Sequence, residues 1–190
     1  MCRLFLLVVL LLTACASAPP HTQPVVRPAQ AEQAPFVLHG RISVKHDGER
    51  TSATVRWMHQ TREDEILLLA PFGQTMARIH RKELEVTLDT ADEHYSAQDT
   101  GALMQRVLGW QLPLDGLRYW VLALPAPLSP ASIQHDPDGR ISTLAQDGWE
   151  IHYTRYAASG HDSLPLRLIV QRASLEIQLL IDEWEIQPLP

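Results

Sequence analysis

The sequence predicts an α+β fold that is mainly β and is built on an antiparallel sheet. Apolar and polar residues alternate along several stretches before residue 90 and again after residue 149, as they do in half-buried strands. These stretches follow one another through short turns, which is typical of antiparallel hairpins. The middle of the chain changes to the spacing of amphipathic helices. Strands, two helices and further strands therefore follow in order.

In the first half, turn signals separate the strand-like stretches. Asp47-Gly48 predicts a tight hairpin turn, and Pro71-Phe72-Gly73 and Arg81-Lys82-Glu83 predict two more turns. A continuous apolar run, 66–70, precedes the second of these turns. The alternating apolar positions are Phe36, Leu38, Ile42, Val44, Ala53, Val55, Trp57, Thr75, Ala77, Ile79, Leu84, Val86 and Leu88.

Two short helices are predicted in the middle of the chain. Ser96-x-x-Asp99 can cap the start of the first helix, and Gly109 can end it. Pro113 begins the second helix, which Pro125 ends. Their apolar stripes are Leu103, Met104, Val107 and Leu108 in the first, and Leu114, Leu117, Trp120, Val121 and Leu124 in the second.

The last part of the chain returns to strands. Asp136-Pro137-Asp138-Gly139 and Asp147-Gly148 predict turns. The alternating apolar positions that follow are Trp149, Ile151, Tyr153, Leu164, Leu166, Leu168, Val170, Leu175, Ile177, Leu179 and Ile181. If this sheet is strongly curved, it leaves a concave apolar face for the two helices to cover.

The N-terminus has the features of a secretory signal. Arg3 precedes an apolar stretch from Leu4 to Leu12, which is too short to span a bilayer. The ending Leu12-Thr13-Ala14-Cys15 resembles the lipobox of bacterial lipoproteins, which implies cleavage before Cys15 and lipid attachment to it. We therefore expect a signal peptide at 1–14, a lipidated Pro-rich tether at 15–35 and one domain at 36–190. Ala16 favours the outer membrane, because many retained lipoproteins have Asp there.

Composition excludes several classes of function. The chain has 16 basic and 22 acidic residues, and loss of residues 1–14 leaves 15 and 22, a net charge of −7. This charge does not suit nucleic-acid binding. The nine histidines form no H-x-x-x-H or H-E-x-x-H pair, so we expect no metal site and place them on the surface or in turns. No motif for catalysis or for a bound cofactor is present.

Five segments together resemble the LolB family of outer-membrane lipoprotein receptors. They follow the lipobox in the order that the family has, and the resemblance covers the whole chain. The segments are Gly40-Arg41-Ile42-Ser43-Val44, Ala53-Thr54-Val55-Arg56-Trp57, Leu67-Leu68-Leu69-Ala70-Pro71-Phe72-Gly73-Gln74-Thr75, Leu108-Gly109-Trp110-Gln111-Leu112-Pro113-Leu114 and Leu117-Arg118-Tyr119-Trp120-Val121-Leu122-Ala123-Leu124-Pro125.

The resemblance implies an unclosed antiparallel half-barrel with helices over its open side. It also implies a monomeric receptor that is not an enzyme, anchored to the inner leaflet of the outer membrane and facing the periplasm. Such a receptor takes acylated lipoproteins from a LolA-like periplasmic carrier and inserts them into that membrane. The alternative is a lipid-anchored envelope scaffold or assembly factor that handles no acyl chains.

Two sets of residues are candidates for that function. The turn Pro71-Phe72-Gly73 carries Phe72 where the family often has an exposed leucine important for membrane delivery, so Phe72 is either exposed for membrane contact or folded onto the core. The other set either lines an acyl-chain cavity or fills an ordinary core. Its members are Val55, Trp57, Leu67, Leu69, Ile79, Val86, Leu103, Val107, Leu117, Trp120 and Val121.

Overall fold

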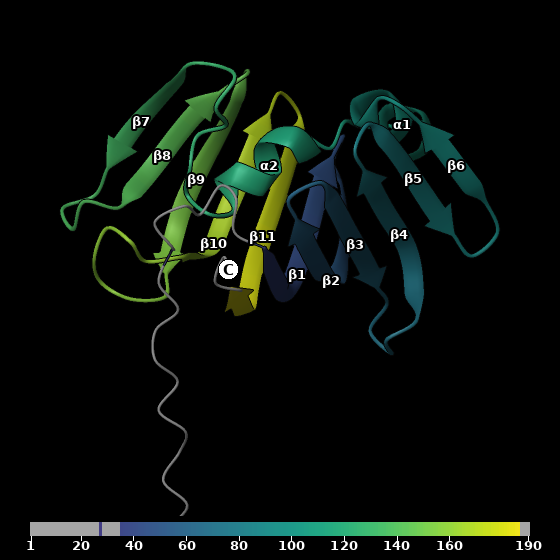
Figure 1. Cartoon of the computed structure of the whole chain (residues 1–190), viewed down its shortest axis with the longest axis horizontal. Helices are drawn as coiled ribbons and strands as arrows, with labels where there is room; N and C mark the ends of the chain where they lie inside the picture. Colours follow the sequence, from purple (N-terminus) through teal and green to yellow (C-terminus); the bar gives the residue numbers. More distant parts are fainter. Residues whose placement is uncertain (1–26, 28–34, 187–190) are drawn as a thin grey trace, which may run out of the picture.

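A computed structural model describes Arg27 and residues 35–186. The described part forms one strongly curved antiparallel sheet in the strand order β6-β5-β4-β3-β2-β1-β11-β10-β9-β8-β7 (Figure 1). The unclosed, mainly β fold expected from the sequence is therefore confirmed. The strands are β1 (Phe36–His46), β2 (Glu49–Gln60), β3 (Glu63–Leu69), β4 (Thr75–Lys82), β5 (Glu85–Thr90), β6 (His94–Ala97), β7 (Ala131–His135), β8 (Ile141–Gln146), β9 (Trp149–Tyr156), β10 (Pro165–Arg172) and β11 (Leu175–Ile186).

The two halves of the sheet meet where β1 pairs with β11. The register shifts between His39 and Gly40, where β1 comes very close to β11. A Cβ atom added to Gly40 would lie 2.2 Å from the carbonyl oxygen of Leu180. Any residue other than glycine would therefore require the backbone of β1 or β11 to move.

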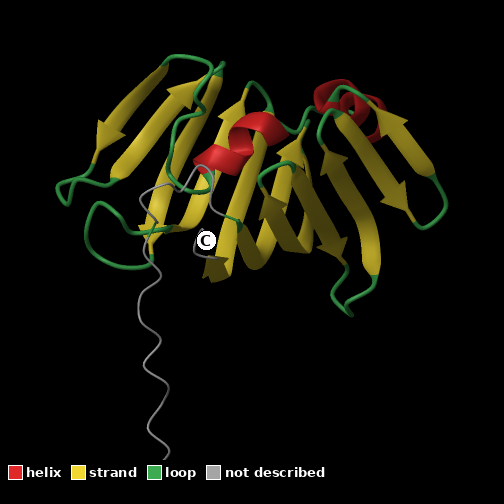
Figure 2. Cartoon of the chain, in the orientation of Figure 1, coloured by secondary structure: helices red, strands yellow, loops and turns green. Residues whose placement is uncertain are grey.

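Two helices cover one face of the sheet, α1 (Thr100–Leu108) and α2 (Leu114–Trp120). α2 lies across the middle of the sheet and α1 lies near β5 and β6 (Figure 2). Both belong to the connection between β6 and β7, which form opposite edges of the sheet. This connection has to cross the sheet, and its apolar residues join the sheet's apolar side in a single core.

The start of α1 differs from the prediction in one respect. Asp99 is the N-cap, and its side chain accepts a hydrogen bond of 2.6 Å from the backbone N–H of Ala102. Ser96 lies in β6 and takes no part in the cap. Gly109 ends the helix in a left-handed conformation with φ 77°, as predicted.

Some strands and turns differ from what the alternation of residues suggested. The strands β6, β7 and β8 were not predicted, because they are short and most of their residues are polar or exposed. Leu84 lies in the turn after β4 and is 81% exposed instead of sharing the core face with Val86. Arg81 belongs to β4 and is buried rather than forming a turn.

Across the residues that the structure describes, no helix has the length and apolar character that crossing a membrane requires.

We predict that Gly40→Ala lowers the free energy of unfolding by about 2 kcal/mol or more, because the new methyl group collides with the β11 backbone. Gly101→Ala in α1 is the matched control. Its Cβ would lie 3.4 Å from Asp99 Oδ1, and alanine favours a helix, so this variant should be no less stable than the wild type. Urea unfolding of both variants measures the difference, and equal stabilities would contradict the prediction.

Candidate functional site

The concave face of the sheet and the inner sides of both helices form one apolar cluster. The buried candidates are Val55, Trp57, Ile79, Val86, Leu103, Leu117, Trp120 and Val121, and Val107 packs against them half-buried. The structure therefore brings nine of the eleven candidate residues together where α1 and α2 meet the sheet. In this conformation the eight buried candidates are nearly inaccessible to solvent, and all nine pack against one another as a core. Acyl-chain binding at this face remains a prediction.

The prediction was wrong about the face on which Leu67 and Leu69 lie. In the register of β2 and β3, Trp57 pairs with Ile66 and Val55 pairs with Leu68, so these residues share the concave face. Leu67 and Leu69 consequently point to the convex face. The run 66–70 is apolar at every position, so its sequence carries no alternation from which the face can be read.

On the convex face, Leu69 lines a shallow hollow of ≈ 360 Å³ together with Pro71, Arg41 and Leu180. This hollow adjoins the turn that carries Phe72, because Pro71 directly precedes that residue. Leu69 therefore lies beside the second candidate site and not in the first.

The α2 helix is seated on the sheet through Trp120. The indole N–H of Trp120 donates a 2.9 Å hydrogen bond to Gln146 Oε1, and the Tyr153 hydroxyl donates a 2.8 Å bond to the Trp120 carbonyl oxygen. Burial raises the pKa of Tyr153 well above its ordinary value, so the phenol stays neutral and keeps its proton to donate. Gly116 leaves room for the indole, because a Cβ there would lie 2.4 Å from the Trp120 ring.

Gln146 is a buried polar residue that the sequence did not single out. Its Oε1 also accepts from the Ala126 backbone N–H at 2.9 Å, and its Nε2 donates to the carbonyl oxygens of Ala126 and Ser129, both at 2.8 Å. One side chain in β8 thus holds α2 and the segment that follows it. Leu144 and Gln146 share the buried face of β8, and this alternation was the signal that could have identified Gln146.

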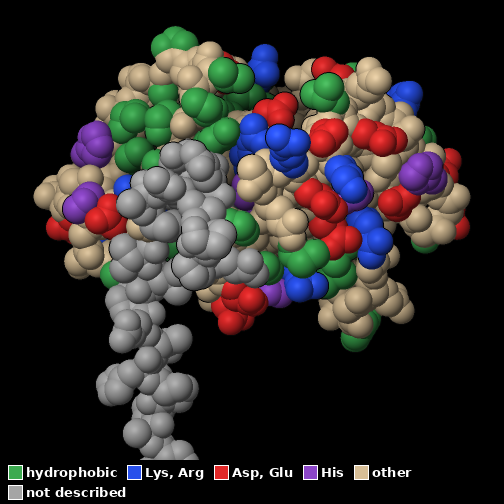
Figure 3. Space-filling model, viewed as in Figure 1, with side chains coloured by type: hydrophobic (Ala, Val, Ile, Leu, Met, Phe, Trp, Pro, Cys, Tyr) green, Lys and Arg blue, Asp and Glu red, His purple; other side chains and the backbone are tan. Residues whose placement is uncertain are grey.

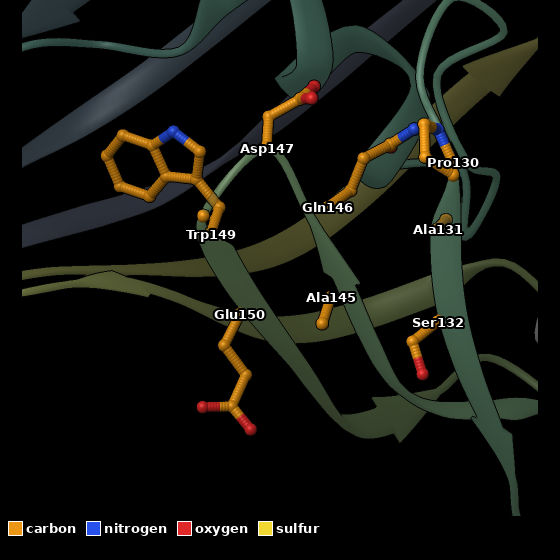
Figure 4. A pocket seen from close by; sticks show the side chains of 9 residues that line it. Pro130, Ala131, Ser132, Ala145, Gln146, Asp147, Trp149 and Glu150 are labelled. Carbon is orange, nitrogen blue, oxygen red and sulfur yellow. The ribbon is translucent and has the colours of Figure 1, made fainter.

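A surface pocket of ≈ 640 Å³ lies on the outer side of this region, where β7, β8 and β9 meet (Figure 4). Ser132, Ala145 and Glu150 line it along neighbouring strands, and Gln146 extends toward the segment that ends at Pro130. It includes none of the residues predicted to hold an acyl chain.

A buried ionic cluster occupies the concave sides of β2, β3 and β4. Asp64 Oδ1 accepts from Trp57 Nε1 at 2.8 Å and lies 2.7 Å from His59 Nδ1, while Asp64 Oδ2 accepts from Arg81 Nε at 2.9 Å. Burial alone would raise the pKa of Asp64. The hydrogen bond from His59 and the charges of His59 and Arg81 outweigh burial and hold that pKa below its ordinary value. His59 is thus buried, which corrects the expectation that the histidines lie on the surface or in turns.

The turn between β3 and β4 exposes Phe72. The Gly73 N–H donates to the Ala70 carbonyl oxygen at 2.8 Å, and the Ala70 N–H donates to that of Gln74 at 2.8 Å, so a tight loop holds the ring outward. Phe72 is 93% exposed, and Met76 nearby is 45% exposed. Of the two alternatives for Phe72, the structure shows the exposed one. Its contact with a membrane remains a prediction.

The rest of the visible surface is mixed in character. Acidic and basic side chains lie among one another over the half of the molecule that contains β1–β5, and hydrophobic side chains gather toward β7–β9 (Figure 3). Another large apolar residue in a loop is Leu128, which is 98% exposed. Leu128 can therefore serve as a control for Phe72, because it is a similarly exposed apolar loop residue in a different part of the sequence.

The predicted lipid-attachment residue Cys15, the signal peptide at 1–14 and most of the tether at 15–35 lie outside the described residues. Within the described ranges, no three His, Cys, Asp or Glu side chains are grouped so that they could hold a metal ion.

Comparison with known proteins gives a consistent picture. Residues 34–184 match the family model described as "Outer membrane lipoprotein LolB". The outer-membrane lipoprotein LolB of Nitrosomonas europaea is 37% identical over 196 residues, covering 97% of this chain and 92% of that protein. The corresponding protein of Thiobacillus denitrificans is 37% identical over 175 residues, covering 92% and 91%.

A solved structure supports the fold alone. A DUF1329 family protein from Desulfovibrio piger superposes with a TM-score of 0.51 and 7% sequence identity, covering 80% of this chain and 85% of that one.

We predict that Trp120→Ala lowers the free energy of unfolding by about 3–5 kcal/mol, because it empties a large volume and leaves Gln146 without one of its partners. Tyr119→Ala removes a half-buried ring from the same helix and should cost clearly less. Urea unfolding followed by circular dichroism compares the two. A smaller loss for Trp120→Ala than for Tyr119→Ala would show that α2 is not seated through Trp120.

We predict that Asp64→Asn lowers the free energy of unfolding by about 3–5 kcal/mol at pH 7, because Arg81 is left buried without its counter-charge. The pKa of Asp64 is lowered on folding, so its charge stabilises the fold above the unfolded pKa. That contribution is lost as the pH falls through the folded pKa. The advantage of the wild type should therefore shrink below about pH 4.

The control for this prediction is Asp182→Asn, which breaks an exposed ion pair with Arg41 and should cost no more than about 1 kcal/mol. Chemical unfolding between pH 3 and pH 7 measures both variants. A difference between wild type and Asp64→Asn that does not change with pH would contradict the assignment.

Proposed function

The chain belongs to the LolB family of outer-membrane lipoproteins, and from this premise we propose that it accepts acylated lipoproteins from a LolA-like periplasmic carrier and inserts them into the inner leaflet of the outer membrane. Lipid on Cys15 anchors it there, and the domain works as a monomer. The proposed role needs no cofactor and no catalytic step.

The observation that carries the proposal is an apolar concave face that, among the described residues, two short helices and the segments beside them cover. These helices have nine and seven residues, and the apolar cluster on the sheet runs from Val86 on β5 to Leu144 on β8. Helices this short have little stability of their own and depend on the contacts that seat them. Displacing α2 would uncover apolar surface without breaking any strand pairing.

Physical chemistry requires such a surface in a protein that handles acylated cargo. Exposing an acyl chain to water costs about 0.8 kcal/mol per CH₂ group, so a lipoprotein cannot cross the periplasm with its chains free. Its chains have to pass from one apolar site to another. A difference of about 1.4 kcal/mol between the sites gives a tenfold preference, so the receptor needs only a slightly better fit than the carrier.

Phe72 supports a separate role in delivery. Its ring stands clear of the core, so it can enter the acyl boundary of a leaflet without disturbing the sheet. Acceptance would then depend on the concave face, and delivery on the turn between β3 and β4.

The close packing of the concave face is the one observation that favours the alternative, a scaffold that binds no acyl chains. A simple experiment distinguishes the two functions. A receptor should take up an acylated lipoprotein from its carrier in solution, and a scaffold should not.

We predict that Phe72→Glu still accepts lipoprotein from the carrier and fails to deliver it to liposomes. A glutamate at this position is repelled by hydrocarbon and by anionic headgroups. Because Phe72 is exposed, its replacement should change the free energy of unfolding by no more than about 0.5 kcal/mol. Transfer from the carrier and incorporation into liposomes are measured separately.

Leu128→Glu is the matched control, since it puts the same charge on an equally exposed apolar loop residue and should deliver normally. Phe72→Leu should also deliver, because it preserves apolar bulk at the turn. Full delivery by Phe72→Glu would remove the membrane role of this residue. If both glutamate variants failed to deliver, the defect would come from the added negative charge and not from the loss of Phe72.

A further inference from the structure

Arg27 makes a set of contacts that joins the N-terminal tether to the end of α2. Its guanidinium Nη1 donates to the carbonyl oxygens of Leu122 at 3.2 Å and Ala123 at 2.8 Å, and Nη2 donates to the carbonyl oxygen of His161 at 2.9 Å. Its backbone N–H donates to the carbonyl oxygen of Asp162 at 2.7 Å. Arg27 is therefore held from both the end of α2 and the loop between β9 and β10.

The carbonyl groups that Arg27 binds are ones for which the helix itself supplies no partner. α2 ends at Trp120, so Leu122 and Ala123 belong to the turn that follows it, and their carbonyl oxygens lie outside the hydrogen bonds of the helix. Ala123 has a left-handed φ of 54°, which turns the chain away from the helix. A cation is favoured at this end because the helix dipole is negative there. The side chain of Arg27 is only 16% exposed, so little water competes with these bonds.

Three polar contacts therefore hold the C-terminal end of α2, and they come from different parts of the chain. Gln146 on β8 and Tyr153 on β9 belong to the sheet. Arg27 belongs to the segment between the predicted lipid anchor and the domain. The contact from Arg27 can break while the sheet stays intact.

We propose that Arg27 is a positioning residue that couples the membrane tether to α2, holding the helix over the apolar face until cargo displaces it. This inference rests on the proposed function, in which α2 moves when acyl chains enter. Release of Arg27 from both α2 and the loop between β9 and β10 would free the helix and the tether together. The cargo-loaded state would then reach farther from its anchor than the empty state.

The change in the maximum distance between the lipid anchor and the domain follows from the number of residues between them. Eleven residues lie between Cys15 and Arg27, and twenty lie between Cys15 and Phe36. At about 3.1 Å per residue in an extended Pro-rich chain, the maximum span from Cys15 is about 40 Å when Arg27 is bound and about 65 Å when it is free.

The test uses the lipidated full-length protein in phosphatidylethanolamine and phosphatidylglycerol liposomes, as wild type and as Arg27→Gln. Amide hydrogen exchange at residues 121–124 should be about tenfold faster in Arg27→Gln, the usual effect of losing a charge-assisted hydrogen bond. Acceptance of an acylated lipoprotein from the carrier should be severalfold faster, since the closed state loses stability. A merely structural role would slow acceptance.

Two further variants sharpen the test. Arg50→Gln removes an exposed arginine that pairs with Glu176, so it makes the same charge change far from α2 and should leave exchange and acceptance as in the wild type. Arg27→Lys keeps the charge but lacks the planar fork that binds several carbonyls, so its exchange should be intermediate.

Unchanged exchange at residues 121–124 in Arg27→Gln would overturn the contact between Arg27 and α2. Faster exchange with unchanged or slower acceptance would overturn the coupling to cargo. A wild type that accepts no lipoprotein would overturn the proposed function, and the coupling with it, whatever the exchange shows.

Discussion

The pairing of β1 with β11 is the contact on which the rest of the structure depends. It joins the first and last strands in the middle of the sheet and leaves β6 and β7 as its two edges. The chain between those edges has to cross the sheet, and the concave apolar face is where its own apolar residues can be buried. The two helices over the open side are thus a consequence of the strand order. Gly40 permits this pairing because any side chain there would meet the backbone of β11.

The two helices are held over the concave face by extensive apolar contacts and by a few hydrogen bonds. Apolar contacts between the helices and the sheet are large but not directional, so they favour burial of the inner face of α2 without fixing its exact position. A hydrogen bond from Trp120 to Gln146, one from Tyr153 to Trp120 and one from Arg27 to Ala123 set its position. A seven-residue helix has little independent stability, so α2 depends on these bonds and on its buried apolar residues to stay over the apolar face.

Apolar residues in this protein fall into two groups with opposite environments. Those on the concave face are shielded from water by their neighbours on the sheet and helices. Phe72 lies on a loop tip with its ring in solvent, where an aromatic side chain gains nothing for folding. The separation of the two groups permits acceptance and delivery to be altered by different substitutions. The buried cluster around Asp64 lies on the concave side and contributes to stability, with a pH dependence of its own.

The sequence by itself determined the elements whose signals are local. Alternation predicted the long strands, Asp47-Gly48 and Pro71-Phe72-Gly73 predicted turns, and the stripe from Leu103 predicted α1. The strands, turns and α1 depend on residues that are neighbours in the chain, so a short stretch contains the information. The half-barrel and its helical cover were implied by the resemblance to the family.

The tertiary structure decided what depends on pairing between distant residues. Leu67 and Leu69 lie on the convex face because the register with β2 places Ile66 and Leu68 inward, and a wholly apolar run has no local preference. The edge strands β6 and β7 exist because neighbouring strands complete their hydrogen bonds. Asp64 with Arg81, Trp120 with Gln146, and Arg27 with Ala123 are 17, 26 and 96 residues apart. No local pattern marks such partners, since only the folded sheet brings their polar groups within hydrogen-bonding distance.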